Sequence, residues 1–77
     1  MQTKLKQVRL NKGLTQAKLA ELANLNVRVL EHYEQGSKKF DHARLDKILN
    51  VCIALDCKIQ DVIENKHYIE LLNKYEK

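Results

Sequence analysis

The sequence predicts an all-α fold, a bundle of five short helices followed by a C-terminal helical extension. Pro is absent, and the only two glycines are Gly13 and Gly36. Apolar residues recur at three- and four-residue spacing in the segments between residues suited to capping, Thr15, Asn26 and Asp41. At 77 residues the chain is long enough for one small domain with a modest core.

The first helix is expected over residues 3–12, with Leu5 and Val8 on its inner side and Leu10 beside them. Arg9 falls within this mostly apolar pattern. A buried guanidinium without a partner is very costly, so we expect Arg9 to be paired.

A second helix is expected over residues 16–23, where Thr15 can cap the first turn. Its inner face carries Leu19, Leu22 and Ala23. The segment 24–26 then breaks the helix, because Asn tolerates the left-handed conformation that often ends a helix.

The third helix is expected over residues 27–35, between a cap at Asn26 and a stop at Gly36. Leu30 and Tyr33 lie inward, which leaves Val27, Arg28, Glu31 and His32 on the outer side. Two short helices joined by a three-residue turn, the second with a free outer face, form a helix-turn-helix arrangement.

The remaining chain predicts a basic loop over 37–40 that Phe40 anchors, a helix over 42–55 capped by Asp41, and a short helix over 59–64. The expected inner positions are Leu45, Ile48, Leu49, Cys52, Leu55, Ile59, Val62 and Ile63. We assign residues 1–64 to one domain and residues 65–77 to a helical tail. Apolar residues cover more than one side of this tail, so it must bury them in its own domain or against another chain, and both remain open.

The charge is unevenly placed along the chain. Residues 1–40 hold eight Lys/Arg against three Asp/Glu, or +5, whereas residues 41–77 hold six against seven, or −1. The basic excess therefore lies on the half with the helix pair, as expected of a nucleic-acid-binding face. A solvated basic surface would give the same count.

The composition argues against several classes of protein. The chain has no Gly-rich phosphate loop, no nucleophile elbow and no His-rich metal motif, so we expect neither an enzyme nor a metal or other cofactor. Cys52 and Cys57 lie among apolar residues, where free buried thiols acting as small hydrophobes are expected. No apolar run approaches membrane-spanning length, and we expect a cytoplasmic, nucleoid-associated protein.

Residues 5–63 resemble the Cro/phage-repressor class of helix-turn-helix domains, the XRE family. The matching segments are RLNKGLTQAKLAELANLN, VRVLEHYEQG and ALDCKIQDVI. They cover about three-quarters of the chain in the family's order and spacing. The resemblance implies a five-helix repressor-like bundle in which Arg9 and Glu34 form the family's internal ion pair.

The resemblance also implies the binding residues. Val27, Arg28 and His32 match positions that touch base edges, and Gln16 matches the position that meets the DNA backbone. Arg28 could bond guanine in bidentate fashion, Val27 could contact a thymine methyl group, and His32 could donate to a base acceptor or a phosphate. The basic residues Lys18, Lys38 and Lys39 are expected at phosphates.

Two departures from the family pattern concern these residues. Lys18 replaces a common capping-box Glu, and the segment after Gly36 is about three residues longer than usual and lacks a Pro.

The expected function is a sequence-specific regulator of transcription, a repressor that binds double-stranded DNA as a homodimer on a palindromic operator. A protein effector is a further possible partner. The alternative is a protein-interaction module that keeps the fold, as in toxin–antitoxin or conjugation systems. Arg28 and His32 with their basic flanks favour DNA, whereas Val27 and Glu31 leave room for the alternative.

Overall fold

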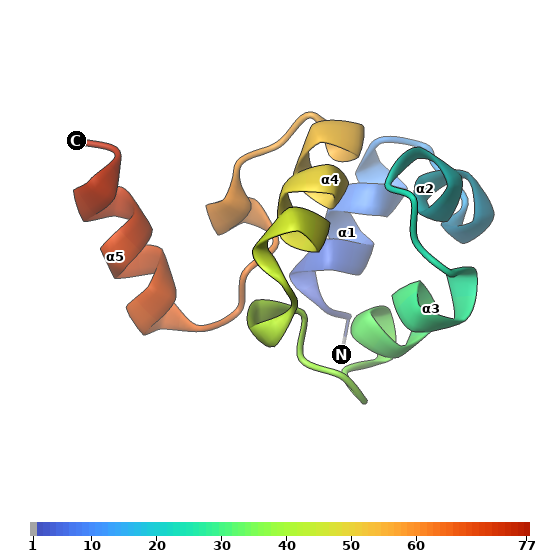
Figure 1. Cartoon of the computed structure of the whole chain (residues 1–77), viewed down its shortest axis with the longest axis horizontal. Coiled ribbons are helices and arrows are strands. Elements are labelled where there is room, and N and C mark those ends of the chain that lie inside the picture. Colours follow the sequence, from blue (N-terminus) through green and yellow to red (C-terminus); the bar gives the residue numbers. More distant parts are fainter. Residues whose placement is uncertain (1) are drawn as a thin grey trace.

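The computed structural model describes residues 2–77, and over that range it is all-helical, which confirms the predicted fold class (Figure 1). None of the helices in this part of the chain has the length and apolar character needed to cross a bilayer. In order, the elements are α1 (Lys4–Asn11), α2 (Gln16–Leu22), α3 (Val27–Gln35), the 3₁₀ turn η1 (Phe40–His42), α4 (Leu45–Leu55), the 3₁₀ turn η2 (Ile59–Asp61) and α5 (Lys66–Tyr75).

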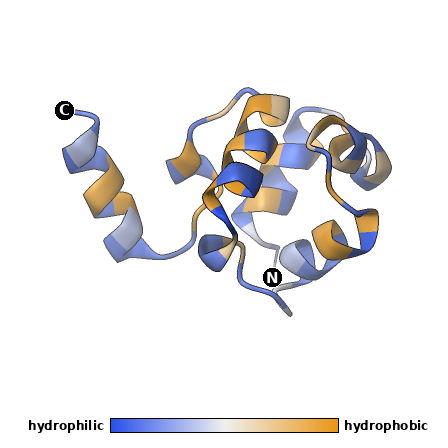
Figure 2. Ribbon diagram, in the orientation of Figure 1, coloured by the Kyte–Doolittle hydropathy of each residue, from blue (hydrophilic) through white to orange (hydrophobic). Residues whose placement is uncertain are grey.

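The core lies where α1, α2, α3 and α4 meet. Helix α2 packs against both α3 and α4, and apolar segments alternate with polar ones along all four helices (Figure 2). Burying one large aliphatic side chain contributes about 1.5–3 kcal/mol, so a few such residues supply most of the stability available to a small domain. The most deeply buried are Leu5, Leu19, Leu30, Val51, Leu55 and Val62.

The helix pair α2–α3 begins, turns and ends at the predicted residues. Thr15 Oγ1 accepts a hydrogen bond of 3.0 Å from the backbone amide of the third residue of α2. Asn24 has a φ of 55°, in the left-handed region, and Asn26 Oδ1 accepts a 2.8 Å hydrogen bond from the second residue of α3. Gly36 ends α3 with a φ of 84°. Local capping chemistry therefore sets the boundaries of this pair.

The predicted start of α4 is wrong. This helix begins at Leu45 rather than at residue 42, and Arg44 precedes it without a side-chain capping bond. Asp41 is engaged elsewhere, because its two carboxylate oxygens accept hydrogen bonds from the backbone amides of Glu64 and Asn65, both at 2.9 Å. A side chain that binds two distant amides is not free to cap the helix that follows it.

The short helix predicted over residues 59–64 is shorter than expected, because only Ile59–Asp61 is helical there, as the 3₁₀ turn η2. At the end of this stretch, the carboxylate of Asp41 accepts a hydrogen bond from the amide of Glu64. Asn65 then caps α5 by accepting from two amides of the first turn of that helix. The fifth α-helix is therefore the tail helix. The two apolar residues after η2 are still buried as predicted, namely Val62 and Ile63.

Four leucines expected on the inner side are exposed instead. Val51, which the sequence analysis did not place inside, is fully buried, so the inner stripe of α4 is rotated relative to the prediction. In α1 and α2 the exposed leucines lie in the last turn. The four leucines, with the fraction of each residue's surface that is exposed, are Leu10 (47%), Leu22 (51%), Leu45 (64%) and Leu49 (41%).

Helix α5 lies beside η2, apart from the other four helices (Figure 1). Gln60 Nε2 donates to Asn73 Oδ1 at 3.2 Å and to Glu76 Oε1 at 2.9 Å. An apolar hollow of about 260 Å³ lies between this helix and α4. Tyr68, Ile69 and Leu72 are partly buried, whereas Leu71 and Tyr75 stay 49% and 87% exposed. The chain therefore covers only part of the apolar surface of its tail.

Both cysteines are free thiols, Cys52 buried and Cys57 partly buried. Burial raises the pKa of Cys52 to about 12 and also raises the pKa of Cys57. Because the thiolate is the reactive form, both thiols are kept unreactive. Their environment fits the predicted role as small apolar side chains.

Replacing Asp41 with Ala should loosen the junction between η2 and α5. The change removes the acceptor for two backbone amides, and we expect a loss of about 1–2 kcal/mol in the free energy of unfolding. Urea denaturation measures this loss, and amide hydrogen exchange should quicken at Glu64 and Asn65. Asp46→Ala is the matched control, because Asp46 is exposed and contacts only its sequence neighbours Arg44 and the amide of Lys47, so its loss should cost about 0.5 kcal/mol. Equal effects of the two substitutions would contradict this role of Asp41.

Candidate nucleic-acid interface

The position of α3 is fixed by a buried ion pair with α1. Arg9 Nε lies 2.7 Å from Glu34 Oε2, and Arg9 Nη2 lies 3.0 Å from Glu34 Oε1, a bidentate arrangement. Arg9 is 6% exposed and Glu34 is 4% exposed. Arg9 Nη1 also donates to the carbonyl of Leu14 at 2.8 Å. The guanidinium expected to need a partner thus has one, and it links α1 to the far end of α3.

Gln16, the first residue of α2, joins the same cluster. Its Nε2 donates to Glu34 Oε1 at 3.0 Å, so one carboxylate orients side chains from two other helices. A polar hollow lies beside this contact, lined by Gln2, Lys6, Gln16, Glu34 and Gln35. The second proton on the Gln16 amide nitrogen is free to donate to another acceptor.

The outer side of α3 begins with two exposed residues. Val27 is 41% exposed, and Arg28 is exposed with no ion pair to any residue of the range 2–77. His32, one turn later, is partly buried, and its Nδ1 lies 3.0 Å from Ser37 Oγ. The three residues expected at base edges therefore extend from the first to the last turn of α3, the first two exposed and His32 half-buried, and the arginine makes no ion pair within the range 2–77.

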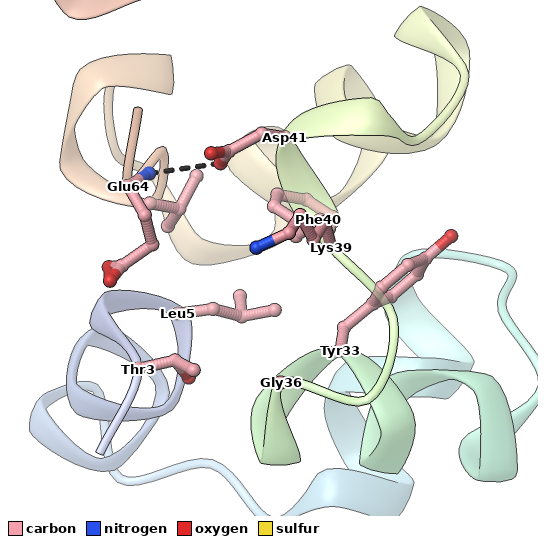
Figure 3. A pocket seen from close by; sticks show the side chains of 9 residues that line it. Thr3, Leu5, Tyr33, Gly36, Lys39, Phe40, Asp41 and Glu64 are labelled. Carbon is pink, nitrogen blue, oxygen red and sulfur yellow. Dashed lines mark hydrogen bonds between the residues drawn. The ribbon is translucent and has the colours of Figure 1, made fainter. Parts of the chain in front are cut away.

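The basic residues around this face differ in their surroundings. Lys18 Nζ lies 3.2 Å from Glu21 Oε1 in an exposed pair, so part of its charge is already compensated. Lys38 is exposed in the loop after Gly36. Lys39 lines a hollow of about 220 Å³ between the start of α1 and η1, and Figure 3 shows its ammonium group reaching over that hollow rather than along α3.

These observations together describe a braced helix pair with an exposed, arginine-bearing outer face. The comparison with protein families agrees with that geometry. A family model for Cro/C1-type helix-turn-helix DNA-binding domains matches residues 4–66. The chain belongs to this family. No curated protein matches the chain in a sequence comparison.

The match of the Cro/C1-type domain extends from the first residue of α1 to the first residue of α5. It therefore includes the ion pair, the helix pair and the basic loop. Membership in this family supports DNA binding as the general role of the chain.

Two residues beside the interface were missed from the sequence. Lys6 lines the same polar hollow as Gln16, and it lies one helical turn before Arg9, so the expected ion pair could have placed it near the end of α3. Ser37 holds the His32 ring across the end of α3. The two are five residues apart around Gly36, a spacing that a left-handed helix end brings together.

Removing the carboxylate of Glu34 should destabilise the Cro/C1-type domain strongly. Glu34→Ala leaves Arg9 buried without a counter-charge, and we expect a loss of about 3–5 kcal/mol in the free energy of unfolding. Urea denaturation and the melting temperature both measure it. The control Glu21→Ala removes an exposed ion-pair partner and should change stability by about 0.2–1 kcal/mol. An unchanged melting temperature for Glu34→Ala would rule out the bracing role.

Proposed function

We propose that the chain is a sequence-specific transcriptional regulator that binds double-stranded DNA, reads the major groove with α3 and acts as a repressor by covering a promoter. The observation that carries this proposal is the exposed start of α3, where Arg28 is unengaged and the helix behind it is fixed by a buried ion pair. A helix-turn-helix protein places that end of its second helix against base edges.

Base reading is assigned to Val27, Arg28 and His32. Arg28 suits guanine, because a guanidinium can bond O6 and N7 together, worth about 1–3 kcal/mol of discrimination. Val27 suits the methyl group of thymine. These contacts supply the sequence preference.

Backbone contacts are assigned to Gln16, Lys18, Lys38 and Lys39. The free amide proton of Gln16 and the exposed ammonium of Lys38 need no rearrangement to meet phosphate. Lys18 would first have to leave Glu21, and Lys39 would have to swing away from its hollow. The first two are therefore the stronger candidates, supported by the +5 charge of residues 1–40.

We also propose that the protein binds a palindromic operator as a homodimer. Exposed apolar side chains gather on the outer side of α4 and on α5, namely Leu45, Leu49, Ile53, Leu71 and Tyr75. Helix α5 and helix α3 lie at opposite ends of the long axis, which measures 34 Å (Figure 1). Copies that met end to end through α5 would hold their α3 helices farther apart than one DNA turn, roughly 34 Å. A side-by-side contact along α4 and α5 suits adjacent half-sites better.

Arg28→Ala should remove sequence preference rather than DNA binding in general. We expect a loss of about 1–3 kcal/mol on the preferred duplex and a much smaller loss on random DNA. Selection from random duplexes gives the preferred sequence, and titration at fixed salt gives the two affinities. Equal losses on both kinds of DNA would contradict base reading by Arg28. If the wild-type protein binds no duplex at low salt, the fold serves protein interaction instead.

Lys38→Ala should weaken DNA binding in general and leave the sequence preference unchanged, in contrast to Arg28→Ala. Losing one phosphate contact weakens binding to all sequences alike and lowers the slope of log affinity against log salt by about 1. Titrations at several salt concentrations measure this slope. Lys47→Ala, on α4, is the control that removes the same charge away from α3. The same slope change in both variants would show that only net charge matters.

Leu71→Lys should weaken the dimer and, with it, cooperative binding to a palindrome. The charge would fall on the exposed apolar side of α5, where it must be desolvated in the contact. Sedimentation equilibrium measures the dimer constant. Leu10→Lys on α1 is a matched control, since Leu10 is 47% exposed and Leu71 is 49% exposed. Truncation after residue 64 that left both dimer and DNA affinity intact would rule out the role of the tail.

A further inference from the structure

The hydroxyl group of Ser37 lies within hydrogen-bond distance of two atoms of His32, the ring nitrogen Nδ1 and the carbonyl oxygen. Ser37 Oγ lies 3.3 Å from the carbonyl oxygen of His32, and it lies 3.0 Å from His32 Nδ1. A carbonyl oxygen can only accept, so the first contact is a hydrogen bond only if the hydroxyl donates to it. The same carbonyl accepts from the amide of Lys38 at 3.2 Å, and its two lone pairs accommodate both donors.

A serine hydroxyl has one proton and cannot donate twice. If the hydroxyl proton of Ser37 points to the carbonyl oxygen of His32, Oγ faces Nδ1 with a lone pair. The contact between Oγ and Nδ1 is then attractive only if Nδ1 carries the ring proton. The opposite tautomer would set a lone pair of Oγ against the lone pairs of the carbonyl. The neutral imidazole that satisfies both contacts is therefore protonated on Nδ1 and bare on Nε2.

We propose that Ser37 is a positioning residue that makes neutral His32 present a hydrogen-bond acceptor, Nε2, to the major groove, so that His32 selects the exocyclic amino group of cytosine or adenine. This inference rests on the proposed DNA-binding function. Within residues 2–77, Nε2 makes no hydrogen bond, so it is available to a ligand. Cytosine N4 and adenine N6 are the amino donors of the major groove, whereas guanine and thymine offer acceptors there.

This assignment changes the role expected from the sequence, in which His32 donates. A bare Nε2 cannot bond a phosphate oxygen, because both atoms are acceptors. His32 is then a base-reading residue and not a backbone contact. Arg28, one turn earlier, supplies donors only. Within the major groove, Arg28 would then recognise hydrogen-bond acceptors on the bases and His32 would recognise hydrogen-bond donors.

The tautomer can be measured in the free protein, without DNA. A long-range proton–nitrogen NMR correlation at about pH 8.5, where a histidine is ordinarily neutral, distinguishes the two ring nitrogens. Nε2 couples strongly to both carbon-bound ring protons, whereas Nδ1 couples strongly to only one. We expect the strongly deshielded, unprotonated nitrogen of His32 to be the one with two strong couplings. His32→Gln assigns the signals, and His67 on α5 serves as the internal comparison.

The substitutions Ser37→Ala and Ser37→Thr separate positioning from folding. Ser37→Ala should let the His32 ring populate both tautomers, and Ser37→Thr, which keeps the hydroxyl, should restore the wild-type spectrum. A strongly deshielded Nδ1 in the wild-type protein would overturn the inference and leave the proposed DNA-binding function untouched.

The base preference tests the second half of the proposal. Selection with His32→Ala identifies the base pair whose preference depends on His32, and at that pair wild-type protein at about pH 8.5 should prefer cytosine or adenine on the contacted strand. Ser37→Ala should lower that preference about two- to tenfold, and Ser37→Thr should retain it. Preference for guanine or thymine, or no pair that depends on His32, would overturn the assignment. Failure to bind any duplex would instead overturn the proposed function and the base-reading role with it.

Discussion

The bidentate contact between Arg9 and Glu34 is the interaction on which the arrangement of the helices depends. It joins residues 25 positions apart, and the same carboxylate also receives the amide of Gln16. Three helices are therefore oriented around one buried group. Removing two charges from water costs several kcal/mol each, and only excellent geometry and further hydrogen bonds offset that cost. Here the guanidinium has a further acceptor in the carbonyl of Leu14, and the carbonyl of Glu34 accepts from Thr3 Oγ1 at 3.2 Å. Apolar packing alone is tolerant of small rotations, whereas this network fixes the angle at which α3 leaves the bundle.

The basic charge and the exposed apolar side chains of α4 and α5 lie on different parts of the chain. The basic half of the sequence forms α1, α2, α3 and the loop that follows, while the exposed apolar residues of α4 and α5 lie on the half with a charge of −1. Figure 1 places α5 and α3 at opposite ends of the long axis. This separation fits the proposed dimer on DNA, because an apolar contact beside the phosphates would have to compete with a strongly hydrated surface.

The parts of the fold that could be predicted from the sequence are those with local causes. Thr15, Asn26 and Gly36 act on the turn next to them, so the bounds of α3 are as expected and those of α2 differ by one residue. Asp41 could not be placed in this way, since its partners are 23 and 24 residues away and nothing near it signals them. The same distant contact takes up the amides of Glu64 and Asn65, so the helix at 59–61 does not continue through residue 64. At the candidate interface, residue types pointed to Arg28 and His32, but they could not show that the His32 ring contacts Ser37 across the end of the helix, the contact on which the proposed tautomer depends.

Binding costs entropy when side chains must be ordered, about 0.5–1.5 kcal/mol for each flexible side chain. Two of the side chains assigned to DNA already have their orientation set within the chain, Gln16 by Glu34 and His32 by Ser37. Arg28 has no such partner among the described residues, so under the proposed function a base pair would have to order it. If α3 enters the major groove as proposed, Gln16 and His32 would set its register at little cost, because their contacts within the chain exist before DNA binds. Under the proposed function both residues would discriminate between bases: His32 would offer its acceptor at little ordering cost, whereas Arg28 would regain its ordering cost only in a bidentate contact with guanine.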